Sequence, residues 1–393
     1  MSKQLNDSLR SRLNQIQMNA SIVGLFALAL SAVGAFNDRP QFFFSYLFGW
    51  LFWLGLSLGC FAVTMIHHLT GGRWGYPTRR FLEAGFLVLP LMLVLFIPIL
   101  FGLHELYPWA RPEEVAAEKV LQQRHSYQNG WFFIVRGVLL FLLWILMSRQ
   151  LRNWSLEQDA SPEAAPTRKA RALSGPGLVI YGLLGTSACV DWIMSLEKHW
   201  YSTMFGVIVL IGQILVAYAF VAVALAFFRR EEPFATTLTQ VHYHHLGNLL
   251  LTFVLFWTYV SFAQLLIVYS GDIPHELDWY LHRIAGNWKA IVVALGLFHF
   301  FIPFFLLLFR SIKRSVAPVA TLAAMIFLMH MVQTYWLVMP ALHQEGLEVH
   351  WLDFTAPIGI GGLWLAVFVW RLKAAPLLPQ HDPGLQFAFV YGH

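Results

Sequence analysis

Charged residues are scarce in this chain of 393 residues. Asp, Glu, Lys and Arg together make up 12% of the sequence, whereas soluble domains carry about a quarter, and 58% of the residues are hydrophobic. This composition excludes a single water-soluble core. We therefore expect an integral membrane protein.

Cysteine is almost absent as well. The two cysteines, Cys60 and Cys189, both lie inside apolar runs. Their number and placement exclude a disulfide framework and a thiolate cage for a metal ion. The sequence therefore predicts neither a metal site nor an iron–sulfur site in this chain.

Long hydrophilic segments are missing too. The two longest, 104–130 and 149–174, have about 26 residues each, which is too short for a further domain. The first is acidic, and the second contains SPEAAPTRKAR, which we expect to be a flexible basic linker. We therefore expect 1–393 to form a single integral membrane domain, with its chemistry in the membrane or at the membrane edges.

What the chain does have is long apolar runs. A hydrocarbon core of about 30 Å needs about 20 helical residues, and ten runs have this length. They are too continuously apolar for barrel strands. The first run follows about 20 mostly polar residues without a cleavage pattern, so we expect it to be retained. The predicted helices lie near 18–36, 42–66, 81–102, 131–148, 175–194, 203–228, 246–270, 287–309, 316–340 and 355–371.

The basic residues predict the orientation of these ten helices. With ten crossings, 18 Lys and Arg residues fall on the side of the two termini and 7 on the other side. The positive-inside rule then places both termini in the cytoplasm. Of the 21 acidic residues, 13 fall on the outer side, where they either dock a basic partner or solvate the loops.

Two ionisable residues lie at membrane depth near the outer edge. Arg136 is roughly 7 to 8 Å below that edge and Asp191 roughly 4 to 5 Å, at the helical rise. Each costs about 2.5 to 3.5 kcal/mol to insert unless it is paired or hydrated. We expect the two side chains to pair or to share a polar cavity, with Ser187 and Ser195 extending the Asp191 face. The alternative is a purely structural pair.

The stretch DWIMSLEKHWYSTMFG, residues 191–206, follows directly. It places Glu197 and His199 between two apolar runs, and we interpret it as the outer lip of a polar pocket. A plain interfacial belt is the alternative, because Trp and Tyr residues prefer the headgroup level.

Further polar residues are spread from one membrane face to the other. His and carboxylate groups exchange protons near neutral pH, so this set predicts a proton pathway. The alternatives are helix-to-helix hydrogen bonds, snorkelling, and haem ligation by the mid-membrane pair His299 and His330. The set contains Gln264 and Gln333 in the outer third, Gln213, His299 and His330 near the middle, and His67, His68, Glu83, His242, His244 and His245 at the inner edge.

Three strings carry a resemblance to a known family. The 191–206 stretch, HHLGNLLLTFVLFWTYVSFAQLLIVYSGDIPHELDWYLHR and FHFFIPFFLLLFR resemble the ActF-type membrane subunit of bacterial alternative complex III, within the NrfD and polysulfide-reductase-like membrane anchors. The likeness covers nearly the whole chain and is strongest over 131–340. It implies two four-helix bundles with flanking helices, in the bacterial cytoplasmic membrane.

The resemblance also implies a function and partners. Such complexes oxidise quinol and pass electrons to a cytochrome c or a similar acceptor. The implied partners are a homologous sister membrane subunit, an extracytoplasmic iron–sulfur subunit, cytochrome c subunits and small membrane subunits, besides lipid and without nucleic acid. Haem c and iron–sulfur clusters belong to those partners, this chain binds no such cofactor itself, and the sister subunit is the one best placed for the quinol.

Two functions follow as hypotheses. In a redox complex, quinol oxidation at an outer pocket releases protons outward, with Asp191 or His199 as acceptor and Arg136 tuning the carboxylate. Alternatively, a standalone proton- or ion-coupled secondary transporter uses the same polar residues. Transporters often have broken helices in matching halves, whereas Pro303 is expected to interrupt one helix only.

Overall fold

The computed structural model describes residues 6–385, except for the side chain of His275. This part of the chain is entirely helical and contains ten helices long and apolar enough to cross a membrane, as predicted. The spans are α1 (Asp7–Asn37), α2 (Arg39–Thr70), α3 to α5 (Gly75–Phe101), α9 (Gly130–Ala160), α10 with η2 (Ala165–Leu196), α11 (Phe205–Phe228), α13 (Gln240–Gly271), α15 to α16 (Trp288–Leu308), α18 with η4 (Val316–Ala341) and α19 (Leu352–Leu372).

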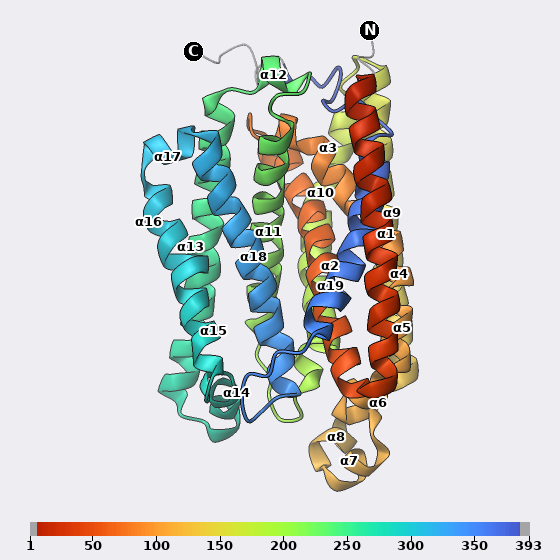
Figure 1. Ribbon diagram of the computed structural model, residues 1–393, viewed down its shortest axis with the longest axis vertical. Helices are drawn as coiled ribbons and strands as arrows, with labels where there is room; N and C mark the ends of the chain where they lie inside the picture. Colours follow the sequence, from red (N-terminus) through yellow and green to blue (C-terminus); the bar gives the residue numbers. More distant parts are fainter. Residues whose placement is uncertain (1–5, 386–393) are drawn as a thin grey trace.

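Eight spans form two groups of four, and two flank them (Figure 1). In the first bundle, α2 packs against α3, α4 and α10, and α9 packs against α4 and α10. In the second, α11 packs against α13 and α18, and α13 also contacts α16. The flanking helices α1 and α19 pack against each other and against α2. This is the predicted arrangement of two bundles with flanking helices.

The two bundles meet where small residues allow close approach. α11 packs against both α2 and α10. A Cβ atom placed on Gly59 of α2 would lie 1.9 Å from the backbone oxygen of Gln213 on α11, so the two backbones touch there. Glycine at such contacts is typical of membrane helices, which associate by close packing because lipid supplies no hydrophobic driving force.

The two ends of the bundle differ. Both ends of the described chain lie at the same end of the molecule, and α14 (Pro274–Ile284), α7 (Pro112–Ala117) and α8 (Lys119–Arg124) lie at the opposite end (Figure 1). We call these the inner and outer ends, after the orientation predicted from the Lys and Arg residues. At the inner end, α12 (Phe234–Thr237) and α17 (Arg310–Arg314) connect spans of the second bundle.

The segment 149–174 is not the flexible linker that its composition predicted. α9 continues to Ala160 and α10 begins at Ala165, so only 161–164 separate the two helices. Hydropathy marks where an apolar run stops, whereas a helix continues as long as its residues favour helix and its polar groups find partners. Gln158, for example, donates to the backbone oxygens of Ser161 and Glu163.

Two spans are irregular, whereas the sequence predicted one. The third consists of α3 (Gly75–Phe86), α4 (Leu89–Val94) and α5 (Ile97–Phe101), followed by α6 (Leu103–Leu106) and η1 (Pro108–Ala110). Pro lies in the first turn of α4 and of α5. Because Pro has no N–H group, it cannot donate to a carbonyl oxygen of the preceding helix, which ends there. The eighth span consists of α15 (Trp288–Ala294), the π-helical segment η3 (Leu295–Phe301) and α16 (Ile302–Leu308), with Pro303 in the first turn of α16.

Candidate functional site at the outer end

A cavity of about 360 Å³ lies at the outer end, between the connections of the two bundles. Its walls come from three segments: the 191–206 stretch supplies 196–200, α14 supplies Asp278, Trp279 and His282, and the outer segment 104–130 supplies Leu106, Pro108, Arg111 and Glu114. Phe44, Ala341 and Gln344 complete the lining. The 191–206 stretch therefore supplies one wall of a pocket, whereas the pocket that the sequence predicted was one shared by Arg136 and Asp191.

The local fold of this stretch explains its exposure to the cavity. α10 ends at Trp192, the short helix η2 (Met194–Leu196) follows, and α11 begins only at Phe205. Residues 197–204 therefore lie between two helices and cross from the first bundle to the second. The side chains of Glu197, Lys198 and His199 line the cavity.

Glu197 is held in this wall by a buried arginine. Nη1 of Arg283 on α14 donates to Oε1 of Glu197 at 3.1 Å, and the same guanidinium donates to the backbone oxygens of Trp279 and Leu337. Arg283 is 1% exposed. Burial lowers its pKa to about 10, against the opposing effect of the Glu197 carboxylate. Arg283 thus fixes Glu197 relative to both α14 and α18.

Two tryptophans form the aromatic wall. The rings of Trp200 and Trp279 stack with centroids 4.3 Å apart and planes at 13°. The guanidinium of Arg283 lies over the Trp279 ring at 3.9 Å from its centroid. Trp200 and Arg283 thus cover the Trp279 ring, and the wall combines stacked aromatic side chains with the Glu197 carboxylate.

The outer segment closes the cavity from the other side. Nη1 of Arg111 donates to Oε1 of Glu114 at 2.6 Å, and Nζ of Lys198 pairs with Oε2 of the same carboxylate. Burial opposes the charged form of Glu114, but these two cations prevail and its pKa is lowered. His199 is exposed at the rim, with Nε2 3.8 Å from Oε1 of Glu118.

Arg136 and Asp191 pair as predicted. Nε of Arg136 donates to Oδ2 of Asp191 at 2.7 Å, and Nη2 donates to Oδ1 at 3.0 Å. Nη1 donates to the backbone oxygen of Tyr127, and the guanidinium lies between the Tyr127 and Phe132 rings. Burial and the nearby Asp191 carboxylate raise the pKa of Tyr127.

This pair does not line the 360 Å³ cavity. A second outer cavity, of about 250 Å³, is lined by Tyr127, Ser195 and Trp200 among others, and Trp200 belongs to both. Oγ of Ser195 donates to the backbone oxygen of Asp191 at 2.6 Å. The Ser187 hydroxyl likewise donates to a backbone oxygen one turn earlier, that of Leu183. That Ser187 extends the Asp191 face stays a prediction.

Near mid-membrane, three predicted residues line one small cavity. Gln213, His330 and Gln333 surround a space of about 30 Å³ between the bundles, which has room for about two water molecules. Nδ1 of His330 lies 3.0 Å from Oε1 of Gln333, and the hydroxyl of Tyr181 donates to Oε1 of Gln213 at 2.9 Å.

His299 lies beside this cavity, with its ring centroid 6.0 Å from that of His330. Both ring nitrogens of His299 are buried and have no hydrogen-bond partner within 6–385. The 30 Å³ cavity that His330 lines is too small for a haem macrocycle. Gln264 is buried on α13 and lines none of these cavities.

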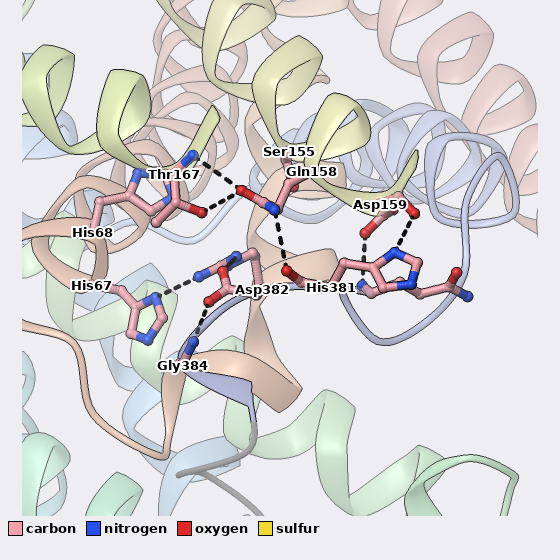
Figure 2. Close-up of polar contacts among 12 residues, drawn as sticks. His67, His68, Ser155, Gln158, Asp159, Thr167, His381, Asp382 and Gly384 are labelled. Atoms are coloured by element: carbon pink, nitrogen blue, oxygen red, sulfur yellow. Dashed lines mark hydrogen bonds and ion pairs between the residues drawn. The ribbon is translucent and has the colours of Figure 1, made fainter. Parts of the chain in front are cut away.

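The inner residues divide into two groups instead of one cluster. In the first bundle, Nη2 of Arg79 lies 3.4 Å from Nδ1 of His67, while Nη1 donates to Oδ2 of Asp382 at 2.5 Å (Figure 2). Nδ1 of His68 lies 3.1 Å from Oγ of Ser174. On α13, His242 instead caps its own helix, with Nδ1 accepting from the backbone N–H of Thr239.

Glu83 is the centre of a buried ion-pair network in the first bundle. Its Oε2 accepts from Nη1 of Arg80 at 2.6 Å and also pairs with Arg152, and its Oε1 accepts from Oγ of Ser155 at 2.5 Å. Arg80 pairs in addition with Asp159. The sequence reading counted these arginines as loop charges, whereas the extended helices bury them.

The C-terminal segment 377–385 crosses the inner end of this bundle (Figure 2). The backbone N–H of Gln380 donates to Oδ1 of Asp159 at 2.7 Å, and Nε2 of Gln158 donates to the backbone oxygen of His381 at 3.1 Å. Asp382 is 5% exposed. No apolar periodicity marks this segment, so the sequence offered no signal for it.

A buried carboxylate that the sequence reading missed lies near the cavity. Asp353, 6% exposed, accepts from Oγ of Ser45 at 2.6 Å and from Nε2 of Gln41 at 2.9 Å. Oε1 of Gln41 lies 2.8 Å from Nε2 of His343, whose Nδ1 is 3.5 Å from Glu348 at the surface. The sequence did contain a signal for this residue, since an Asp directly before an apolar run lies at the membrane edge.

Within 6–385, no group of three or more His, Cys, Asp or Glu side chains is placed to hold a metal ion. Neither the known protein families nor the curated protein sequences contain a match to the chain.

Proposed function

We propose that this chain is a membrane subunit of a quinol oxidoreductase complex that delivers electrons to a cytochrome c-type acceptor, in the bacterial cytoplasmic membrane with both termini in the cytoplasm. The observation that carries this proposal is the 360 Å³ outer cavity, walled by Glu197, His199, Trp200 and Trp279. The stretch 196–200 that forms one wall belongs to the strings that resemble the alternative complex III subunit.

The cavity suits the chemistry of quinol oxidation. Two hydroxyl groups must lose their protons as two electrons leave, so each needs a nearby acceptor. Glu197 is held in place by Arg283, and His199 lies at the solvent side, where a proton can leave. The electrons pass to iron–sulfur and haem groups in partner subunits, namely the extracytoplasmic iron–sulfur subunit and the cytochromes c. The other proposed partners are the sister membrane subunit and small membrane subunits.

Asp191 and Arg136 fit a positioning role in this proposal. Both carboxylate oxygens of Asp191 are engaged by one guanidinium, and Asp191 lines neither outer cavity. The pair fixes the outer end of α10, from which the 193–206 wall starts. Glu197 and His199 are therefore the better candidates for proton acceptors.

The buried polar groups offer a route for proton movement. Asp353, Gln41 and His343 form a hydrogen-bonded path that reaches Glu348 at the surface. Within the described chain, no hydrogen bond joins the mid-membrane residues to the inner group around Glu83. Transfer across the whole membrane then requires water or a conformational change.

One observation favours the alternative of a standalone transporter, namely that two spans are broken. However, the third span is the second helix of its bundle and the eighth is the third helix of the other bundle. Transporters built from repeats break corresponding helices. The broken spans therefore give the transporter less support than the outer cavity gives the redox complex.

Gentle purification followed by a mass measurement and an optical spectrum tests the proposal. We expect this chain to co-purify with c-type haem and iron–sulfur signals and with quinol oxidation activity. A colourless protein that exchanges ions on its own would refute the redox complex.

A second experiment tests the cavity. In the purified complex, Glu197→Gln and His199→Gln should each lower kcat/KM for quinol by at least about tenfold, as expected for the loss of a general base. His125→Gln, at an exposed histidine of the same outer segment that does not line this cavity, should leave it unchanged. Equal activity of all three variants would remove the cavity from the mechanism.

A further inference from the structure

At the inner end, the buried arginines of the first bundle have carboxylate partners, whereas the cations on α17 have none in the described chain. In the first bundle, the chain neutralises its own buried guanidiniums, since Arg79 pairs with Asp382 and Arg80 and Arg152 pair with Glu83. In the second bundle, α17 carries Arg310, Lys313 and Arg314, and no carboxylate within 6–385 lies at ion-pair distance from any of them. Exposed cations of the first bundle, such as Arg168 and Arg171, have no carboxylate at that distance within 6–385 either, so what distinguishes α17 is three cations within five residues, which a bound anion would stabilise.

Lys313 is the central residue of this group. It is only 9% exposed, and its side chain packs against α13, where a Cβ atom on Gly247 would lie 2.7 Å from Cγ of Lys313. Gly247 therefore leaves the space that lets the lysine lie against the helix. The stem of Lys313 is therefore buried against α13, and its ammonium lies at the end of that stem, on the same short helix as Arg310 and Arg314.

α13 adds a fourth basic group. His244 lies one turn before Gly247 and interacts electrostatically with Lys313, Arg310 and Arg314. Its Nδ1 atom is buried and has no hydrogen-bond partner in the described chain. We call Arg310, Lys313, Arg314 and His244 the inner cationic cluster. Four cationic or protonatable groups without an acid repel one another unless an anion binds between them.

The surface beside the cluster is apolar. Phe309, Leu308 and Phe305 are 59%, 51% and 54% exposed. They precede Arg310 directly in sequence, on and just after α16, which lies with α17 at the outside edge of the second bundle (Figure 1). A ligand bound there meets cations at the membrane edge and hydrocarbon below them. Only an amphiphile matches both surfaces.

We propose that the inner cationic cluster binds the phosphate group of an anionic phospholipid of the inner leaflet, with the acyl chains along the exposed face of α16. Lys313 provides an ammonium whose stem is held against α13, and Arg310 and Arg314 provide two exposed guanidiniums. Basic residues at a cytoplasmic membrane edge attract anionic lipid by about 1 kcal/mol each. This site is independent of the quinol proposal, because it lies at the opposite end of the molecule.

Native mass spectrometry of the purified complex with added lipid tests the site. We expect phosphatidylglycerol or cardiolipin to bind in preference to phosphatidylcholine. Lys313→Met should weaken that binding roughly fivefold, as should each of Arg310→Gln and Arg314→Gln. Arg168→Gln, which removes an exposed cation of α10 at the same end, serves as the matched control and should leave binding unchanged.

Several outcomes would overturn the proposal. These are equal binding of phosphatidylcholine, an equal loss in Arg168→Gln, and complete displacement of the lipid by inorganic phosphate, which would identify a free-phosphate site. Should Lys313→Met fail to fold, the two surface variants decide alone, because Arg310 and Arg314 are exposed and their replacement disturbs no packing. An undiminished affinity in the Arg310→Gln and Arg314→Gln double variant refutes the site.

Discussion

Trp200 and Trp279 stack almost in parallel, with ring centroids 4.3 Å apart, although 78 residues separate them in sequence. Trp200 belongs to the connection between the two bundles, and Trp279 belongs to α14, between α13 and α15. Their contact joins two outer connections into one wall of the cavity. The geometry of the cavity therefore depends on contacts that no single connection can form alone.

A double-mutant cycle measures this contact. We expect Trp200→Leu and Trp279→Leu to show a coupling of about 0.5 to 1.5 kcal/mol in the free energy of unfolding, beyond the loss of buried area. Trp279→Leu should cost more, because Trp279 also contacts Arg283. Unfolding in mixed detergent gives both values, with the exposed Trp131→Leu as control. Strict additivity would show that the two rings do not support each other.

Replacing Asp191 separates a structural role from a catalytic one. Asp191→Asn leaves the Arg136 guanidinium without its carboxylate, and breaking a buried pair costs about 3 to 5 kcal/mol. Replacing both residues by apolar ones, as in Arg136→Met with Asp191→Leu, removes the uncompensated charge and should restore most of the stability. We expect quinol turnover to recover with it. A stable but inactive double variant would instead make Asp191 a proton acceptor.

Glu83 should be essential for the stability of the first bundle. Glu83→Gln removes the charge that faces Arg80 and Arg152, and we expect a loss of about 3 to 5 kcal/mol in the free energy of unfolding. Glu157→Gln changes an exposed carboxylate of α9 and should stay within about 0.5 kcal/mol of the wild type. Equal stability of both variants would contradict the network.

The outer segment should detach in acid. The pKa of Glu114 is lower in the folded protein than its usual value of 4.5, so its contribution to stability is fully present above pH 4.5 and is lost as the pH falls through the lower, folded-state pKa. Limited proteolysis of 104–130 should therefore accelerate as the pH falls below about 4.5.

The matched variants sharpen this test. Glu114→Gln should remove the pH dependence and give rapid cleavage throughout, because neither Lys198 nor Arg111 retains its carboxylate. Glu113→Gln, at the exposed neighbour, should behave as the wild type does. Cleavage of the wild type that does not change with pH would exclude Glu114 as the fastening of this segment.

The ten spans and the Arg136–Asp191 pair could be predicted because each depends on a local rule. A run of about 20 apolar residues must cross the membrane, and a buried arginine must find a carboxylate. The wall of the outer cavity was also predictable in part, since the 191–206 stretch is polar between two apolar runs. The burial of Arg283 could not be predicted, because the sequence of a short amphipathic helix does not distinguish a buried cation from an exposed one.

Long-range contacts explain the remaining errors. Arg80 and Arg152 read as loop charges because both lie just outside the apolar runs. Arg80 pairs with Glu83 of its own helix and with Asp159 of α9, and Arg152 pairs with Glu83 from another helix. The inner histidines share one depth in the sequence reading, yet His67 and His242 belong to different bundles. Depth can be counted along a helix, whereas the direction in which a side chain points depends on its neighbours.

The contact between Asp382 and Arg79 has a consequence for biosynthesis. Arg79 enters the membrane with the third span, while Asp382 is synthesised only after the last of the ten spans. Until then the guanidinium has to stay hydrated or be shielded by an insertion factor. The inner surface of the first bundle therefore closes only after all ten spans have been made, and a ribosome that stalls before codon 382 leaves a nascent protein whose inner end is open.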